Sequence, residues 1–206
     1  VESFQSLFLK AYFPLEFQVA VINNFGGFYH SWVYFNEARR CGASIHMPCV
    51  NNSTYYTTLY GSDIYIGFVH VQNLETKLAK QIVVEREQNG PFTDLPDFIS
   101  RIPIGNEQIT ILIRLDALRF TQKSKKERLW EAHMLLGKGS TQTTSRSLFA
   151  ARPRHFKLPP LEQCSIEDAY DEMELIGFTV TMNIFDMLET MYLGKIRAKH
   201  LKNKFR

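Results

Sequence analysis

Gly67-Phe68-Val69-His70-Val71-Gln72-Asn73-Leu74-Glu75 is the stretch that decides the fold, because a turn here leads the chain directly into a helix. Asparagine tolerates left-handed backbone and caps helices well, so Asn73 suits the tight part of that turn. The helix is expected over residues 74–86, where one face carries the apolar residues Leu74, Leu78, Ile82 and Val83. We therefore expect a helical unit that opens at a tight turn.

Further helical patterns follow this unit. They cover residues 92–99, 106–118, 125–136 and 166–193. Between the last two, residues 137–160 contain Gly, Ser, Thr, Pro and scattered basic residues without periodicity. That composition is typical of a linker, and the chain ends in a basic tail.

The region before the turn mixes helices with short strands. A helix over residues 3–25 is expected to break or kink at Pro14, because proline removes an intrahelical hydrogen bond. A second helix over residues 31–41 stops at Gly42, a residue suited to a left-handed helix end. An extended segment (45–52) and a β-hairpin (55–59 with 63–68) follow. The expected fold class is mainly α with a small β-hairpin.

The bulk composition is that of an ordinary globular domain, with 45% hydrophobic and 22% charged residues. No apolar run approaches the ~20 residues that span a bilayer, so no membrane partner is expected. The chain begins Val1-Glu2-Ser3, without a signal peptide or an initiating Met, which fits a piece of a longer protein. Three cysteines at irregular positions favour a reducing cytoplasm over a disulfide framework.

Charge is unevenly distributed along the chain. Ten Lys/Arg stand against two acids between Arg119 and Lys157, and six acids without a basic residue lie between Glu162 and Glu174. Residues 186–206 are basic again. Two basic blocks around an acidic one suit contact with a phosphate backbone, and solvated surfaces with a flexible linker are the alternative.

Three stretches carry a family resemblance: Leu9-Lys10-Ala11-Tyr12-Phe13-Pro14-Leu15-Glu16-Phe17, Glu37-Ala38-Arg39-Arg40 and Pro48-Cys49-Val50-Asn51. Together they resemble the fingers region of the bacterial replicative DNA polymerase III alpha subunit, a C-family polymerase. The resemblance implies a segment of a DNA-directed DNA polymerase of chromosomal replication. It also suggests that Lys10, Arg39 and Arg40 face the template, the nucleotide or a neighbouring domain. A surface ion pair with Glu37 or Glu16 is the alternative.

The turn at Asn73 and a second one at Gly105 resemble the family's tandem helix-hairpin-helix module. In that module each hairpin aims backbone N–H groups at a duplex phosphate. The implied DNA-binding residues are Asn73, Leu74, Glu75, Thr76, Lys77, Lys80, Gly105 and Asn106. The family's hairpin glycines are replaced by Asn73 and Glu75, and its later glycine by Asp116. Glu75 would repel a phosphate, and Lys77 and Lys80 are expected to compensate.

A short segment within the expected linker resembles the sliding-clamp-binding pentapeptide. It reads Ser145-Arg146-Ser147-Leu148-Phe149, with Ser145 where the family prefers Gln. Such a peptide inserts Leu and Phe into an apolar pocket of its partner. The resemblance therefore implies a sliding clamp as a second partner, besides a primer–template duplex and the other domains and subunits of the replicase.

The resemblance divides the chain into four parts. These are the distal fingers (1–60), the tandem helix-hairpin-helix module (61–136), a flexible basic linker (137–161) and a helical lead-in to a missing oligonucleotide-binding barrel (162–206). Two-metal polymerase chemistry needs clustered carboxylates, and no Asp-x-Asp pair occurs here. Asp94 and Asp97 are expected to serve as caps or turn residues. We expect no catalysis and no cofactor in this segment, with Mg²⁺ implied for an intact polymerase.

Two alternatives from other classes stay open. One is a protein-interaction scaffold whose hairpins have lost DNA contact. The other is a small metal-dependent enzyme that uses zinc-ligand residue types at His30, Cys41, His46 and Cys49. The gaps between these four residues match no common zinc module.

Overall fold

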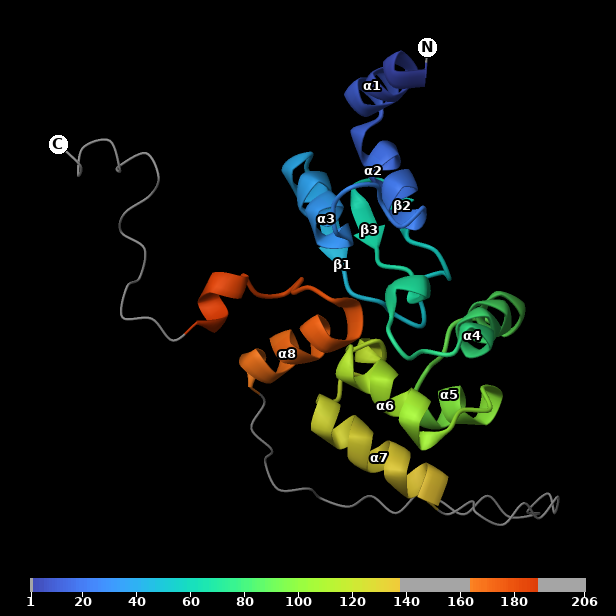
Figure 1. Cartoon of the computed structure of the whole chain (residues 1–206). Helices are drawn as coiled ribbons and strands as arrows, with labels where there is room; N and C mark the ends of the chain where they lie inside the picture. The colour runs from blue at the N-terminus through green and yellow to red at the C-terminus, as the bar shows by residue number, and fades with distance from the viewer. Residues whose placement is uncertain (1, 138–163, 189–206) are drawn as a thin grey trace.

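The computed structural model describes residues 2–137 and 164–188 (Figure 1). In chain order these form α1 (Glu2–Tyr12), α2 (Pro14–Asn23), α3 (Ser31–Arg40), β1 (Ser44–His46), β2 (Thr58–Tyr60), β3 (Asp63–Tyr65), η1 (Phe68–His70), α4 (Thr76–Asn89), α5 (Leu95–Arg101), α6 (Asn106–Arg114), η2 (Arg119–Thr121), α7 (Lys125–Gly137), α8 (Ser165–Ile176) and η3 (Ile184–Met187). The predicted class, mainly helical with a small β element, is confirmed.

Local signals placed the first helix boundaries correctly. Pro14 occupies the first turn of α2, directly after α1, so the predicted break is confirmed. Gly42 follows α3 with φ +96°, the left-handed conformation expected there. In Figure 1, α1 projects beyond the rest of the molecule, and α2 and α3 lie against the small sheet.

The sheet has three strands in the order β1-β3-β2. β2 and β3 form the predicted antiparallel hairpin, with Leu59 opposite Ile64. β1 pairs with β3 in parallel, with Ile45 also opposite Ile64; its extended backbone was predicted, and its pairing with the hairpin was not. The prediction of an extended segment over residues 45–52 is wrong at residues 50–52, which form a turn.

Residues 47–53, which we call the crossover loop, join the sheet to the helices that follow. Arg119 donates to two backbone carbonyls at the start of this loop, each at 3.0 Å. Arg86 donates to two more carbonyls farther along, at 2.7 and 2.8 Å. Asn51 exchanges two 2.9 Å hydrogen bonds with the backbone of Phe92. The loop is thus held by three separate parts of the helical half.

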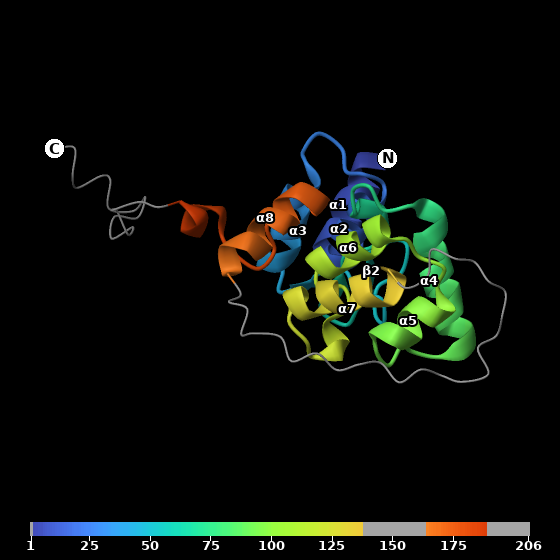
Figure 2. The same ribbon diagram turned by 90° about the horizontal axis from the view of Figure 1, so that it is seen from below.

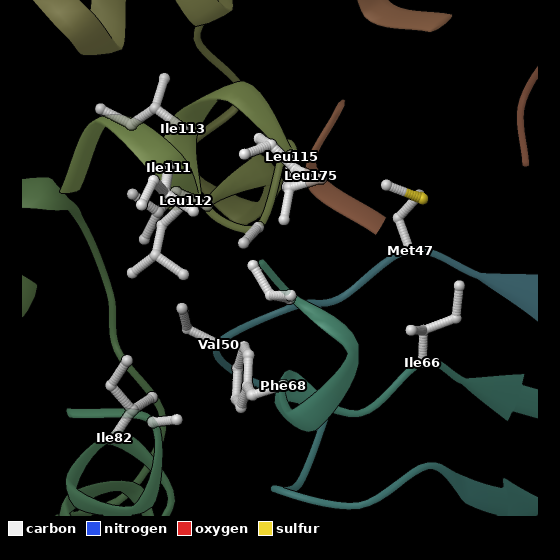
Figure 3. Packing of buried hydrophobic residues seen from close by; sticks show 14 of the residues in the cluster. Met47, Val50, Ile66, Phe68, Ile82, Ile111, Leu112, Ile113, Leu115 and Leu175 are labelled. Atoms are coloured by element: carbon white, nitrogen blue, oxygen red, sulfur yellow. The ribbon is translucent and has the colours of Figure 1, made fainter. Parts of the chain in front are cut away.

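A single hydrophobic cluster runs beneath the loop and links both halves. Figure 3 shows Met47 and Ile66 next to the sheet, Phe68 and Val50 in the middle, and Leu112 and Leu115 on the α6 side. Leu175 of α8 joins the same cluster. Burial of apolar side chains is the main favourable term in folding, and this cluster draws its members from both halves, so the two halves are packed as one body.

Candidate nucleic-acid interface

The helical half contains two short turns that each lead into a helix. The first connects η1 to α4 through residues 71–75, and the second connects α5 to α6 through residues 102–105. Asn73 has φ +61° in the first turn, the left-handed conformation that this residue type tolerates. We call these two turns hairpin 1 and hairpin 2. Figure 2 shows α4, α5, α6 and α7 gathered on the same side of the molecule.

The helices that follow the two hairpins begin without side-chain caps. In the described chain, neither Glu75 before α4 nor Gly105 before α6 provides a capping side-chain hydrogen bond. By contrast, Asp94 caps α5 by accepting from the N–H of Asp97 at 2.7 Å, which confirms the capping role predicted for Asp94. Ser124 and Glu127 cap α7 reciprocally. The first N–H groups of α4 and α6 are therefore left for another acceptor, and the helix dipole favours an anion there.

One side chain joins the two hairpins. The amide oxygen of Gln108, in the first turn of α6, accepts the N–H of Glu75 at 2.9 Å. Its amide nitrogen donates to the carbonyl of Asn73 at 3.0 Å. Beside these bonds lies a groove of about 250 Å³ whose lining includes Glu75, Lys77, Leu78, Pro103, Ile104 and Gly105. The two helix N-termini thus flank one shared groove.

Both signs of charge occur around the hairpins. Lys77 is exposed on the wall of the groove, where it can contact an anion. Lys80 lies elsewhere, with its ammonium 5.0 Å from the centre of the Tyr55 ring. Glu75 and Glu107 are exposed at the two helix starts. Of the two lysines expected to offset Glu75, only Lys77 lines the groove.

Asp116 has no place in either hairpin. It lies after the C-terminal end of α6, with φ +56°, about 15 Å along the helix from Asn106. Its carboxylate accepts from Arg128, which is 3% exposed. Asp116 thus lies outside both hairpins, where it serves the left-handed turn and neutralises a buried guanidinium.

Acidic residues of α8 form ion pairs with cations of α6 and α7. Arg114 of α6 contacts Asp171 at 2.7 Å and Glu174 at 2.5 Å. Lys125 of α7 contacts Asp168 at 2.7 Å. The hydrogen bond from Arg114 lowers the pKa of the Glu174 carboxyl, and Glu174 raises the pKa of Arg114 in turn. Helix α8 consequently lies along α6, as Figures 1 and 2 show.

The other described cations of the basic block are also engaged. Lys123 contacts Glu131 at 2.7 Å, and Lys126 contacts Glu167 at 3.6 Å. Arg119 and Arg128 bind the crossover loop and Asp116, as described above. Between residues 119 and 137, the described cations are therefore engaged within the molecule, which neither the phosphate-contact interpretation nor the solvated-surface alternative predicted.

The three basic residues of the fingers resemblance have separate positions. Arg40 forms an exposed ion pair with Glu37 at 3.0 Å, the alternative given from sequence. Arg39 donates to the carbonyl of Val180 at 2.7 Å. Lys10 is exposed in the last turn of α1. Arg39 thus holds the segment after α8 against α3.

The four zinc-ligand residue types do not form one cluster. His30 and Cys41 flank opposite ends of α3, about 15 Å apart along the helix. His46 lies 2.9 Å from Asp63, and buried Cys49 contacts Asn52. Within residues 2–137 and 164–188, no three His, Cys, Asp or Glu side chains are grouped to hold a metal ion.

Residues 145–149, the expected clamp peptide, lie outside the described residues. None of the helices in the described chain has the length and apolarity to cross a membrane. Gln108 was missed from sequence, because its partners are backbone atoms that leave no residue-type signal.

Comparison with known proteins yields a consistent set of relatives. A family model described as a helix-hairpin-helix motif matches residues 42–128. The chain is 36% identical over 132 residues to the error-prone DNA polymerase of Mycobacterium bovis, covering 63% of this chain and 12% of that protein. It is 27% identical over 226 residues to the DNA polymerase III subunit alpha of Treponema pallidum, covering 100% and 19%.

A third relative is the DNA polymerase III subunit alpha of Thermus aquaticus, 31% identical over 120 residues, with 56% of this chain and 10% of that protein covered. The chain therefore spans less than a fifth of the length of these relatives, from 10% to 19%.

Proposed function

The chain belongs to the C-family DNA polymerases, the group that contains DNA polymerase III alpha subunits and error-prone DNA polymerases, and we propose that its two hairpins bind primer–template duplex within such a polymerase. Each hairpin presents the free N–H groups of a helix start to a phosphate, so contact is with the DNA backbone. Binding is therefore independent of base sequence, as a polymerase requires.

The observation that carries this proposal is the pair of uncapped helix starts at α4 and α6. They flank one groove and are joined by Gln108; α2, α3 and α8 also begin without side-chain caps, but none of these three helices lines that groove. Two N-termini that lack caps and open on one groove provide two anion sites at a fixed spacing. Lys77 adds a cation to the same groove.

Fluorescence anisotropy of a labelled primer–template duplex, titrated with the 206-residue chain at several salt concentrations, tests this function. The logarithm of the affinity should fall linearly with the logarithm of the salt concentration, with a slope of about −0.9 for each phosphate neutralised. Lys77→Glu should weaken binding by about tenfold or more, through the lost cation and the added repulsion.

The matched control is Arg40→Glu, which reverses an exposed cation on α3 that is paired with Glu37. It should leave the affinity within about twofold of the parent chain, because it is distant from the groove. A folded chain that binds no duplex even at low salt would refute the proposal and favour the scaffold alternative.

We also propose that Ser145–Phe149 tethers the polymerase to a sliding clamp. The support is in the sequence, where Leu148 and Phe149 form an apolar pair within a Ser-, Thr- and Arg-rich segment. Surface plasmon resonance with an immobilised sliding clamp tests it. Leu148→Ala with Phe149→Ala should abolish binding, and Ser140→Ala with Thr141→Ala in the same segment should not.

The remaining proposals concern the whole polymerase. Nucleotidyl transfer and its Mg²⁺ ions are assigned to parts of the polymerase beyond this segment, which acts in duplex binding and clamp attachment. Its partners there are the other domains and subunits of the replicase. The cytoplasm is the compartment that fits this role, and Cys41, Cys49 and Cys164 are all free thiols.

A further inference from the structure

We propose that Gln108 is a positioning residue that couples the two hairpins, so that the N-termini of α4 and α6 engage one duplex at a fixed spacing. This inference rests on the proposed function and goes beyond it by assigning the coupling to a single side chain. Gln108 starts from the first turn of α6, behind hairpin 2, and reaches the backbone of hairpin 1. It touches both halves of the proposed site.

The two bonds of Gln108 fix the backbone around the left-handed residue of hairpin 1. They hold the carbonyl of Asn73 at 3.0 Å and the N–H of Glu75 at 2.9 Å. The intervening turn is therefore clamped on both sides by one planar amide. Because Asn73 has φ +61°, an unbraced turn has other backbone conformations open to it. The bonds thus select the conformation from which α4 begins.

The two Gln108 hydrogen bonds, which we call the brace, leave other backbone N–H groups at the hairpins free. The N–H of Glu75 is used by Gln108, so the donors left at hairpin 1 are the first N–H groups of α4 itself. At hairpin 2 the backbone N–H of Gln108 belongs to the first turn of α6. The backbone N–H of Gln108 therefore belongs to the proposed anion site at the start of α6, while its side chain positions the backbone of the site at the start of α4.

The coupling matters because the two sites act together. When two contacts are made to one ligand, the second is gained only if the spacing of the sites matches that of the ligand. The two Gln108 bonds lie at solvent-exposed atoms, where water competes for the same partners, so they contribute little to folding. We therefore expect loss of the brace to weaken DNA binding more than stability.

The test compares Gln108→Met with Gln88→Met in the 206-residue chain. Methionine matches the length of glutamine and lacks its hydrogen bonds. Gln88 is exposed near the far end of α4, outside the groove, and among the described residues its side chain makes no hydrogen bond, so it is a matched control. Three quantities are measured: the urea midpoint of unfolding, hydrogen exchange of the Glu75 amide, and duplex affinity against salt.

For Gln108→Met we expect an unchanged urea midpoint and faster exchange of the Glu75 amide. Duplex affinity should fall by about tenfold, and the salt slope should become shallower by about 0.9, the equivalent of one lost phosphate contact. Gln88→Met should match the parent chain in all three measurements. If Gln108→Met unfolds the chain, Gln108→Asn replaces it, because that amide is one methylene too short to reach hairpin 1.

Three outcomes overturn the inference. Equal duplex affinities and equal salt slopes for Gln108→Met and Gln88→Met would show that the two Gln108 hydrogen bonds are structural only. Tighter binding by Gln108→Met would show that Gln108 blocks the N–H of Glu75 from DNA. Failure of the parent chain to bind duplex would overturn the proposed function itself, and it is distinguished from the first two because the parent is measured beside the variants.

Discussion

Arg128 donates a hydrogen bond to the carboxylate of Asp116, which joins a guanidinium that is 3% exposed to a residue in left-handed backbone at the end of α6. The pair links α6 to α7. It also accounts for an acidic residue at a position where the resemblance led us to expect glycine.

Asp116→Asn should lower the free energy of unfolding by about 2–3 kcal/mol, because it leaves the buried charge of Arg128 without its counterion. Asparagine tolerates the same backbone, so the effect reports the lost charge. Urea unfolding measures it. The control is Lys123→Gln, which removes an exposed pair and should cost about 0.5 kcal/mol or less. Equal stabilities of the two variants would contradict the role given to Asp116.

Arg114→Gln should loosen α8, because it removes the contacts to Asp171 and Glu174. Hydrogen–deuterium exchange should rise along α8 and stay unchanged in α4. Arg40→Gln, which breaks a more exposed pair on α3, is the control and should not change exchange in α8. An α8 that stays equally protected after loss of Arg114 would show that its apolar contacts through Leu175 suffice.

Gly67→Ala should destabilise the chain by about 2–4 kcal/mol, since overpacking forces the backbone to move. A Cβ at Gly67 would lie 2.3 Å from the carbonyl carbon of Tyr56 and 2.4 Å from the nitrogen of Thr57. Gly105→Ala is the matched control, because a Cβ there meets no heavy atom of the described residues and the φ of −87° suits alanine. Thermal unfolding of both variants separates the close contact from a general intolerance of alanine.

His70 should make stability depend on pH between about 4 and 6.5. Burial lowers the pKa of the His70 imidazole from 6.5 to about 4. The unfolded chain therefore binds a proton in this window that the folded chain does not, so stability is full above pH 6.5 and falls as the pH drops towards 4. The loss can reach about 3 kcal/mol when the whole shift is expressed.

His70→Phe, which keeps an aromatic ring against Phe25 and Phe35, should remove this part of the pH dependence. Urea midpoints at several pH values measure it. His133→Phe on the exposed face of α7 should leave the profile of the parent chain unchanged. A parent profile that is flat between pH 4 and 6.5 would show that His70 is solvated.

Glu75→Gln should tighten duplex binding by a few-fold, about what the removal of one like charge near a phosphate provides. The N–H of Glu75 stays in place for Gln108, so the brace is kept. Glu87→Gln, an exposed residue near the other end of α4, gives the effect of net charge alone. Anisotropy at fixed salt compares the two. An equal gain in both variants would exclude a local role for Glu75.

The helices could be predicted because their signals are local. Apolar spacing located α4 and α6, and Pro14 and Gly42 placed the ends of α2 and α3 to within a residue or two. The pairing of β1 could not be predicted, because its partner is β3, and the register of Ser44 with Asp63 depends on residues distant in sequence. Local periodicity gives no information on such a parallel pairing.

The candidate site was predicted in outline and not in detail. The hairpin positions followed from the family resemblance around Asn73 and Gly105, and the left-handed backbone that Asn73 tolerates agrees with it. The bonds of Gln108 join side chain to backbone, and those of Arg114 join α6 to an acidic helix nearly sixty residues later. Contacts of either kind leave no pattern in composition, so the basic block looked like a DNA-binding surface.

The crossover loop has a mechanical consequence. Arg86 and Arg119 donate hydrogen bonds to four of its carbonyls, so the loop is held in place and does not serve as a hinge between the two halves. A displacement of the hairpins by a bound ligand is therefore transmitted through the loop to the sheet. By contrast, α1 is exposed from Ser3 to Tyr12 and projects from the body of the molecule, so it lies outside this path (Figure 1).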